Sequence, residues 1–105
     1  MRDYQYIDTT EAFVRYRKAL RERGVDEVAV DIEGEFNLHI YGEHFCLLQI
    51  YDGRNAVLVD PYTVAIAEIQ AFFEDRGLLK ITYDAAGDRT LLFRNHGIRM
   101  RAILD

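Results

Sequence analysis

Two carboxylates follow an apolar run in the first third of the chain. The run Val28-Ala-Val-Asp31-Ile-Glu33 is short and rich in β-branched residues, as is typical of a buried strand. Residues i and i+2 of a strand project from the same face, so this pattern places Asp31 and Glu33 side by side. Neighbouring carboxylates repel each other and resist burial, and a bound divalent cation offsets both costs. Oxygen ligands favour Mg²⁺ or Mn²⁺ over zinc. The alternative is an edge strand on which both carboxylates are solvated.

A third acidic candidate lies in residues 80–92. Asp84 is placed to cap a helix, which is a structural role. Asp88 lies one turn further along and shares its face with the leucines three and four residues later, so we expect it to need a partner. The small residues at 85–87 allow another group to approach the backbone there. The alternative is that Asp88 is exposed or paired with Arg89.

The pattern of apolar runs and turn residues predicts the elements that position these acids. Asp8-Thr9-Thr10-Glu11 has the spacing of a capping box at the start of a helix that ends at Gly24. Residues 34–43 are expected to form a loop or the irregular ends of a hairpin. The other expected elements are strands at 4–7, 27–32, 45–51, 56–59, 78–83 and 101–105, and helices at 63–75 and 85–95.

These elements predict an α/β fold with a mixed sheet and flanking helices. Asp52-Gly53 between two apolar runs is a strong hairpin signal. We therefore expect the strands at 27–32, 45–51 and 56–59 to be consecutive antiparallel neighbours. A right-handed crossover through the helix at 63–75 then places the strand at 78–83 parallel to the first of them, on its other side. The final strand is expected to enter the core.

Composition limits the classes of function. The chain has 105 residues, which corresponds to one domain spanning residues 1–105. Its net charge of −5 argues against a protein that holds nucleic acid through a broad basic face. The single cysteine excludes an intrachain disulfide and an all-cysteine zinc site. The first residues lack the apolar middle region of a signal peptide, so we expect a cytoplasmic location.

The order of these motifs resembles the DEDD superfamily of 3′–5′ exonucleases, and in particular its RNase D-like branch. The resemblance covers roughly residues 26 to 105 and is carried by two segments. The first, VAVDIEGEFNLHIYGEHFCLLQIYDGRNAVLVDP, matches the DxE motif, the LxQI strand and the turn after it. The second, KITYDAAGDRTLLFRNHGIRMRAILD, matches the second motif of the family. The resemblance implies an RNase H-like fold and hydrolysis of nucleic acid, RNA or single-stranded DNA, from its 3′ end.

The resemblance also implies roles for individual residues. Two divalent ions, Mg²⁺ or Mn²⁺, are expected, with Asp31, Glu33 and Asp88 as catalytic metal ligands. Bound ions reconcile an acidic protein with a nucleic-acid substrate, because the ions supply the positive charge. The residues just after the DxE motif are implied to contact the terminal nucleotide; they are Gly34, Glu35, Phe36, His39 and Tyr41.

The chain departs from the family pattern in two places. Tyr83 stands where RNase D-like proteins often have histidine. The third motif, a Tyr or His followed at i+4 by the fourth carboxylate, is not found before Asp105. We therefore expect weak metal binding and little hydrolysis by these 105 residues. We also expect an apolar patch at the helix at 85–95 and the terminal strand, where a missing C-terminal segment would pack, and such a patch favours self-association.

Two further interpretations stay open at this point. One is a non-catalytic nucleic-acid-binding or protein-interaction module that retains the exonuclease fold. The other is a fragment whose missing part comes from another chain.

Overall fold

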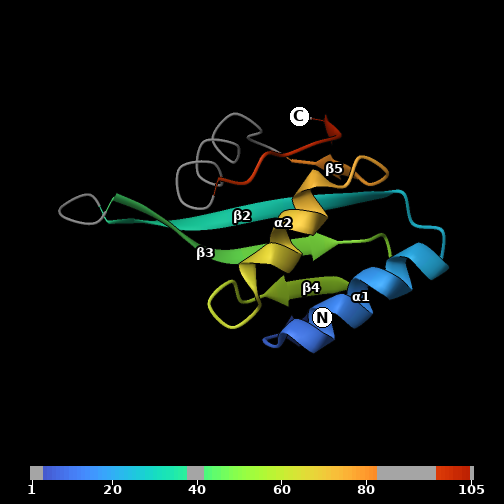
Figure 1. The fold of residues 1–105 in the computed structure, drawn as a ribbon, viewed down its shortest axis with the longest axis horizontal. Helices are drawn as coiled ribbons and strands as arrows, with labels where there is room; N and C mark the ends of the chain where they lie inside the picture. Colours follow the sequence, from blue (N-terminus) through green and yellow to red (C-terminus); the bar gives the residue numbers. More distant parts are fainter. Residues whose placement is uncertain (1–3, 38–41, 83–96, 105) are drawn as a thin grey trace.

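One mixed sheet dominates the computed structural model, which describes residues 4–37, 42–82 and 97–104, with side chains at 4–32, 47–82 and 97–104 (Figure 1). The described elements, in chain order, are β1 (Tyr4–Ile7), α1 (Thr10–Glu22), β2 (Glu27–Asn37), β3 (Gly42–Tyr51), β4 (Ala56–Val59), α2 (Ile66–Glu74), β5 (Leu79–Ile81) and β6 (Ile103–Leu104). The predicted helix at 85–95 lies outside the described residues.

The predicted sheet topology is confirmed. The strand order is β1-β4-β3-β2-β5-β6. β2 pairs with β3 and β3 with β4 in antiparallel fashion, whereas β5 runs parallel to β2 on its other side. β1 is an edge strand, as expected, and it pairs with β4 in parallel. β6 forms the opposite edge; Ile103 packs against the core, as expected of the last strand, whereas Leu104 is exposed.

The hairpin between β2 and β3 is longer than expected. The segment at 34–43 was predicted as a loop or irregular hairpin ends, but β2 continues to Asn37 and β3 begins at Gly42. The register shifts between Glu33 and Gly34, which is a β-bulge. The ribbon projects beyond the rest of the sheet (Figure 1). Sequence patterning misses it because glycines and charged residues have low strand propensity, and only the cross-strand hydrogen bonds hold them extended.

Helix α1 begins one residue later than the predicted capping box implies. Thr9, and not Asp8, is the N-cap: its backbone is extended, and its side chain accepts a hydrogen bond from the Ala12 N–H at 3.1 Å. The helix ends as predicted before Gly24, which has a φ of +71° and so occupies the left-handed region that glycine tolerates. Helix α2 begins at Ile66 and not at 63, because residues 60–64 first form a hydrogen-bonded turn.

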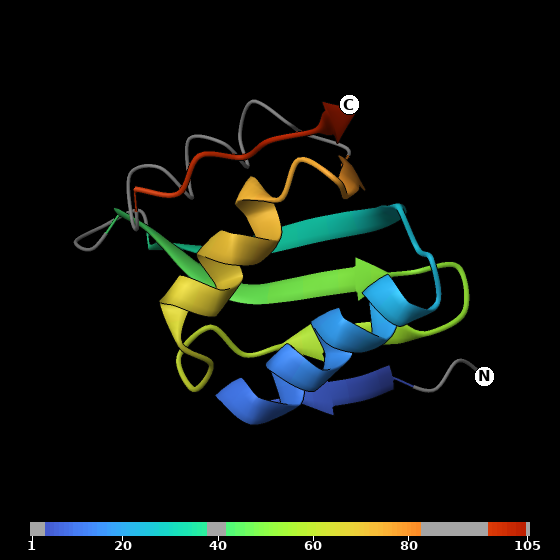
Figure 2. The same ribbon diagram turned by 45° about the vertical axis from the view of Figure 1, so that its right-hand side comes forward.

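Both described helices cover the same face of the sheet (Figure 2). Phe13 of α1 packs on Phe72 of α2 with ring centroids 5.9 Å apart, and Phe72 meets Phe73 edge-on at 5.1 Å. Alternate residues of the strands complete this core; they are Val28, Val30, Ile32, Leu48, Ile50, Val57 and Val59. Neither described helix is long and apolar enough to cross a membrane.

Candidate functional site

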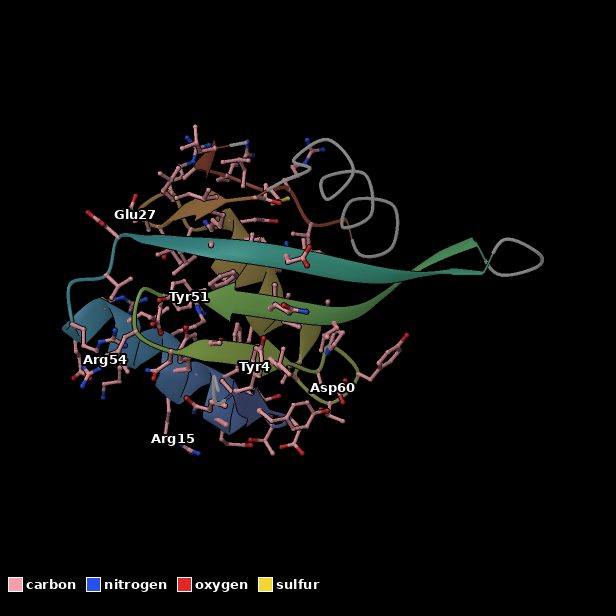
Figure 3. The ribbon with its side chains drawn as sticks, turned by 180° about the vertical axis from the view of Figure 1, so that it is seen from behind. Tyr4, Arg15, Glu27, Tyr51, Arg54 and Asp60 are labelled. Atoms are coloured by element: carbon pink, nitrogen blue, oxygen red, sulfur yellow. The ribbon has the colours of Figure 1, made fainter. Side chains whose placement is uncertain are left out.

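The sheet face opposite to the two helices is open, and Figure 3 looks onto it. The strand register aligns its residues in two rows that run across the strands. The first row, from one sheet edge to the other, is Tyr4, Ala56, Tyr51, Ala29, Ile81 and Leu104. The second row is Tyr6, Leu58, Gln49 and Asp31.

Asp31 lies on this open face, on a strand inside the sheet. β2 has β3 on one side and β5 on the other, so it is not an edge strand, although its pairing with β5 ends at Ala29, before Asp31. Its side chain is nevertheless exposed, because the described helices lie on the opposite face. Asp31 pairs with Gln49 of β3, and both line a hollow of about 530 Å³ together with Thr82.

The other predicted metal ligands are placed less completely. Glu33 follows Asp31 on the same strand, and its backbone lies opposite Leu47 just before the β-bulge. Its side chain is not among those described. Asp88 lies outside the described residues. The convergence of the three carboxylates therefore stays a prediction.

Three of the five predicted substrate-binding residues lie on the described part of the projecting hairpin. Gly34, Glu35 and Phe36 continue the backbone of β2 and pair with residues 43–45 of β3. His39 and Tyr41 lie outside the described residues. Gly34, Glu35 and Phe36 therefore follow the DxE motif along a β-strand, and not along a loop as the sequence pattern first indicated.

A protein holds a metal ion through several ligands. No three His, Cys, Asp or Glu residues among the described side chains lie close enough together to hold one. Asp31 is a hard oxygen donor accessible to solvent, and it therefore fits one position in the coordination shell of Mg²⁺ or Mn²⁺.

Residues that the sequence analysis did not single out complete the lining of the hollow. Tyr4 and Tyr51 stand on either side of Ala56, and Ile81 and Thr82 border the hollow on the β5 side. Gln49 was expected on the face opposite to Leu48 and Ile50, and it lies there. A signal for Tyr51 was present, because it alternates with buried Ile50 and so belongs to the same face as Gln49.

A family comparison connects this arrangement to known proteins. The model of a 3′–5′ exonuclease family matches residues 4–105, which is almost the whole chain. No curated protein matches the chain.

Solved structures show the same fold. Escherichia coli RNase D superposes with a TM-score of 0.83 at 23% identity, over 98% of this chain and 27% of the RNase D chain. Trypanosoma brucei RNase D in complex with RNA U12 gives a TM-score of 0.78 at 23% identity, over 97% of this chain and 37% of that one. The EXD2 exonuclease domain gives 0.79 at 19% identity, over 98% of this chain and 56% of that one.

The present chain thus spans between about a quarter and just over half of the length of these proteins. The mixed sheet with its two described helices has the expected RNase D-like exonuclease fold. With the family match over nearly its full length, the chain belongs to the 3′–5′ exonuclease family.

Proposed function

We propose that this chain supplies part of a metal-dependent 3′–5′ exonuclease site, in which Asp31, Glu33 and Asp88 hold Mg²⁺ or Mn²⁺. The observation that carries the proposal is the position of Asp31, an exposed carboxylate beside a hollow on the open sheet face of an exonuclease-family chain. Divalent ions held by carboxylates activate a water molecule and stabilise the leaving 3′ oxygen. The EXD2 exonuclease domain has been studied after soaking in Mg and in Mn, which supports the choice of metal.

The proposed substrate is the 3′ end of RNA or single-stranded DNA. Trypanosoma brucei RNase D binds RNA U12 in its crystal structure, and the same class of ligand is proposed for this chain. The residues proposed to contact the terminal nucleotide are Gly34, Glu35, Phe36, His39 and Tyr41. The backbone N–H and C=O groups of Gly34, Glu35 and Phe36, which follow the acidic motif on β2, support this assignment.

The first prediction concerns metal binding. Addition of Mn²⁺ is expected to raise the melting temperature, since a ligand that binds only the folded state stabilises it. With about 10 mM Mn²⁺ and a dissociation constant of about 1 mM, the free energy of unfolding rises by about 1.4 kcal/mol and the melting temperature by roughly 5 °C. The variant Asp31→Asn is expected to lose this rise. Differential scanning calorimetry with and without the metal measures both.

The matched control for this experiment is Asp26→Asn. Asp26 is also exposed, but it lies before β2 and does not line the hollow. Its variant is expected to retain the full Mn²⁺ response. An equal response in Asp31→Asn and in the wild type would show that Mn²⁺ binds elsewhere, and the metal-ligand role of Asp31 would then be wrong.

The second prediction concerns activity. These 105 residues are expected to trim a labelled single-stranded oligonucleotide slowly or not at all in Mn²⁺, because the sequence carries two of the three family motifs. Loss of a water-orienting acid or base costs about 10² to 10⁴ in rate. Gel analysis of the reaction over time provides the measurement. Rapid 3′ trimming that Asp31→Asn abolishes would show a complete site and contradict the prediction.

A further inference from the structure

Two exposed tyrosines border a narrow slot on the open face. In the first row of the sheet, Tyr4 and Tyr51 are the Cα partners of Ala56 from its two sides. Their side chains are 54% and 42% exposed, whereas Ala56 between them is 6% exposed. Figure 3 shows Tyr4 and Tyr51 on this face. We call this arrangement of Tyr4, Ala56 and Tyr51 the tyrosine slot. The small Ala56 forms its floor and the two tyrosines form its sides.

The dimensions of the tyrosine slot suit a planar ring. Neighbouring strands lie about 4.8 Å apart, so the tyrosines stand about 10 Å apart at their Cα atoms. Aromatic rings stack with centroids about 4.5 to 7 Å apart, so a ring above Ala56 is within stacking range of both tyrosines. The three residues belong to the lining of the hollow of about 530 Å³. That volume falls in the range of small-molecule sites, which is about 300 to 1,000 Å³.

The charges around the slot determine what kind of ligand it favours. The described residues of the two rows include no lysine or arginine, Asp31 contributes a carboxylate, and the chain carries a net charge of −5. The described residues of these two rows therefore offer no positive charge to phosphate groups. Stacking on aromatic side chains is independent of ligand charge, and open sheet faces with exposed aromatics bind single-stranded nucleic acid through its bases.

We propose that the tyrosine slot binds a nucleobase of a single-stranded nucleic acid whose 3′ end lies at Asp31. This inference rests on the proposed exonuclease function and adds a base-binding subsite to it. Asp31 lies in the next row and two strands across from Ala56; with rows about 6.8 Å and strands about 4.8 Å apart, their Cα atoms are about 12 Å apart. Asp31 and both tyrosines line the same hollow, so one ligand reaches the slot and the acidic residue together.

The test measures binding without catalysis. Fluorescence anisotropy of a labelled oligouridine is recorded in EDTA, which removes divalent metal. Tyr51→Ala and Tyr4→Ala are each expected to weaken binding about fivefold or more, the effect of losing one base–aromatic contact. Tyr51→Phe is expected to bind as the wild type does, because phenylalanine stacks equally well. Ala56→Leu fills the slot while leaving both tyrosines in place, and it is expected to weaken binding similarly.

Matched controls separate stacking from other causes. Tyr62 is 70% exposed but does not line the hollow, so Tyr62→Ala is expected to leave affinity unchanged. An abasic oligonucleotide carries the same phosphates without bases and is expected not to bind. Affinity for oligouridine is expected to vary little with salt, because few counterions are released. Melting curves of each variant show that it is folded.

The outcome also separates this inference from the exonuclease proposal. Asp31→Asn is expected to lose the Mn²⁺ response but to bind oligouridine in EDTA. Tyr4→Ala and Tyr51→Ala are expected to keep the Mn²⁺ response but to bind oligouridine more weakly. Equal binding of the abasic oligonucleotide would overturn the inference, as would wild-type affinity in both Tyr51→Ala and Ala56→Leu. The inference would also be overturned if the wild type does not bind oligouridine and sediments as a dimer that these substitutions disrupt. The slot would then be assigned to a second copy of the chain.

Discussion

Replacement of Asp52 by alanine is expected to lower the free energy of unfolding by about 3 kcal/mol, the cost of leaving buried donors without an acceptor. The Asp52 carboxylate is buried in the β3–β4 turn. It accepts hydrogen bonds from the backbone N–H groups of Arg54 and Asn55 at 2.9 and 2.8 Å. It also accepts one from the buried Tyr16 hydroxyl at 2.8 Å, and the guanidinium of Arg23 lies 3.6 Å away. Urea unfolding at neutral pH measures the effect.

The same contacts predict a dependence on acid. Burial by itself raises the pKa of Asp52, but the hydrogen bonds from Asn55, Tyr16 and Arg54 and the charge of Arg23 outweigh it, so the pKa lies below its ordinary value of 3.8. A group whose pKa is lowered by folding stabilises the folded state at pH values above its unfolded pKa. That stabilisation is lost as the pH falls through the folded pKa. The Asp52→Ala variant is therefore expected to lose less stability than the wild type below about pH 4.

Asp60 provides a control, because it has the same kinds of contact on a more exposed carboxylate, with one backbone N–H hydrogen bond fewer and no ion pair with an arginine among the described residues. It too accepts a hydrogen bond from a turn N–H, that of Tyr62 at 2.8 Å, and one from a tyrosine hydroxyl, that of Tyr6 at 3.2 Å. Both contacts are at the surface, where water replaces a lost acceptor. Asp60→Ala is expected to cost less than about 1 kcal/mol for this reason. Equal losses in the two variants would contradict the importance of burial at Asp52.

A second large effect is expected at Lys80, whose side chain is completely buried beneath the helices. Its ammonium group donates to the backbone carbonyls of Asp75 and Arg101 and lies 5.9 Å from the centre of the Phe72 ring. It thus links the end of α2 to the segment before β6. Burial lowers its pKa to about 8 from an ordinary 10.5, with Asp75 opposing the shift and Arg17 adding to it.

The lowered pKa sets the sign of the pH dependence. Between the two pKa values the unfolded chain binds the proton and the folded chain does not, so stability rises with pH. The wild type is expected to gain about 2 kcal/mol between about pH 7 and 9.5, and Lys80→Met is expected to lack this gain. Urea unfolding at a series of pH values measures the slope. The range stops below 10, because burial raises the pKa of Tyr16 and that group then lowers stability.

Two results would contradict this prediction. Parallel pH profiles in the wild type and Lys80→Met would show that Lys80 stays charged in the folded state up to its ordinary pKa. A wild-type profile that falls over the same range would give the opposite sign of linkage. Lys18, which is exposed, supplies the control, and Lys18→Met is expected to leave the slope unchanged.

Much of the fold was predictable because local signals were consistent with one another. Asp52-Gly53 between two apolar runs predicted the β3–β4 hairpin, and the apolar residues at 27–32 predicted a strand inside the sheet. With short connections and a right-handed crossover, few strand orders were possible, and the predicted one is observed. The boundaries were less predictable. Thr9 and Asp8 are both good caps, and only the backbone geometry at Thr9 decides between them.

The site was predictable in part. Strand alternation predicted from the sequence alone that Asp31 and Glu33 project from one face, and the register then shows Gln49 opposite Asp31. The alternation did not show which face the helices cover, because both faces of the central strands carry apolar or small residues. The described structure resolves this for Asp31, whereas Glu33 and Asp88 remain predictions because they depend on side chains outside it.

The sequence by itself determined the order of the described elements and the pairing of β2, β3, β4 and β5, since these follow from periodicity, short-range turn chemistry and the handedness of crossovers. The role of Asp31 was implied by the resemblance to a known family. Only the tertiary structure decided that Lys80 and Asp52 are buried, and that Tyr4 and Tyr51 lie on either side of Ala56. The physical reason is that burial and cross-strand neighbours depend on residues far apart in the chain. Tyr4 and Tyr51 lie on either side of Ala56 because β1 and β3 both pair with β4. Lys80 donates a hydrogen bond to the backbone carbonyl of Arg101, in the segment before β6. No local pattern encodes either relation.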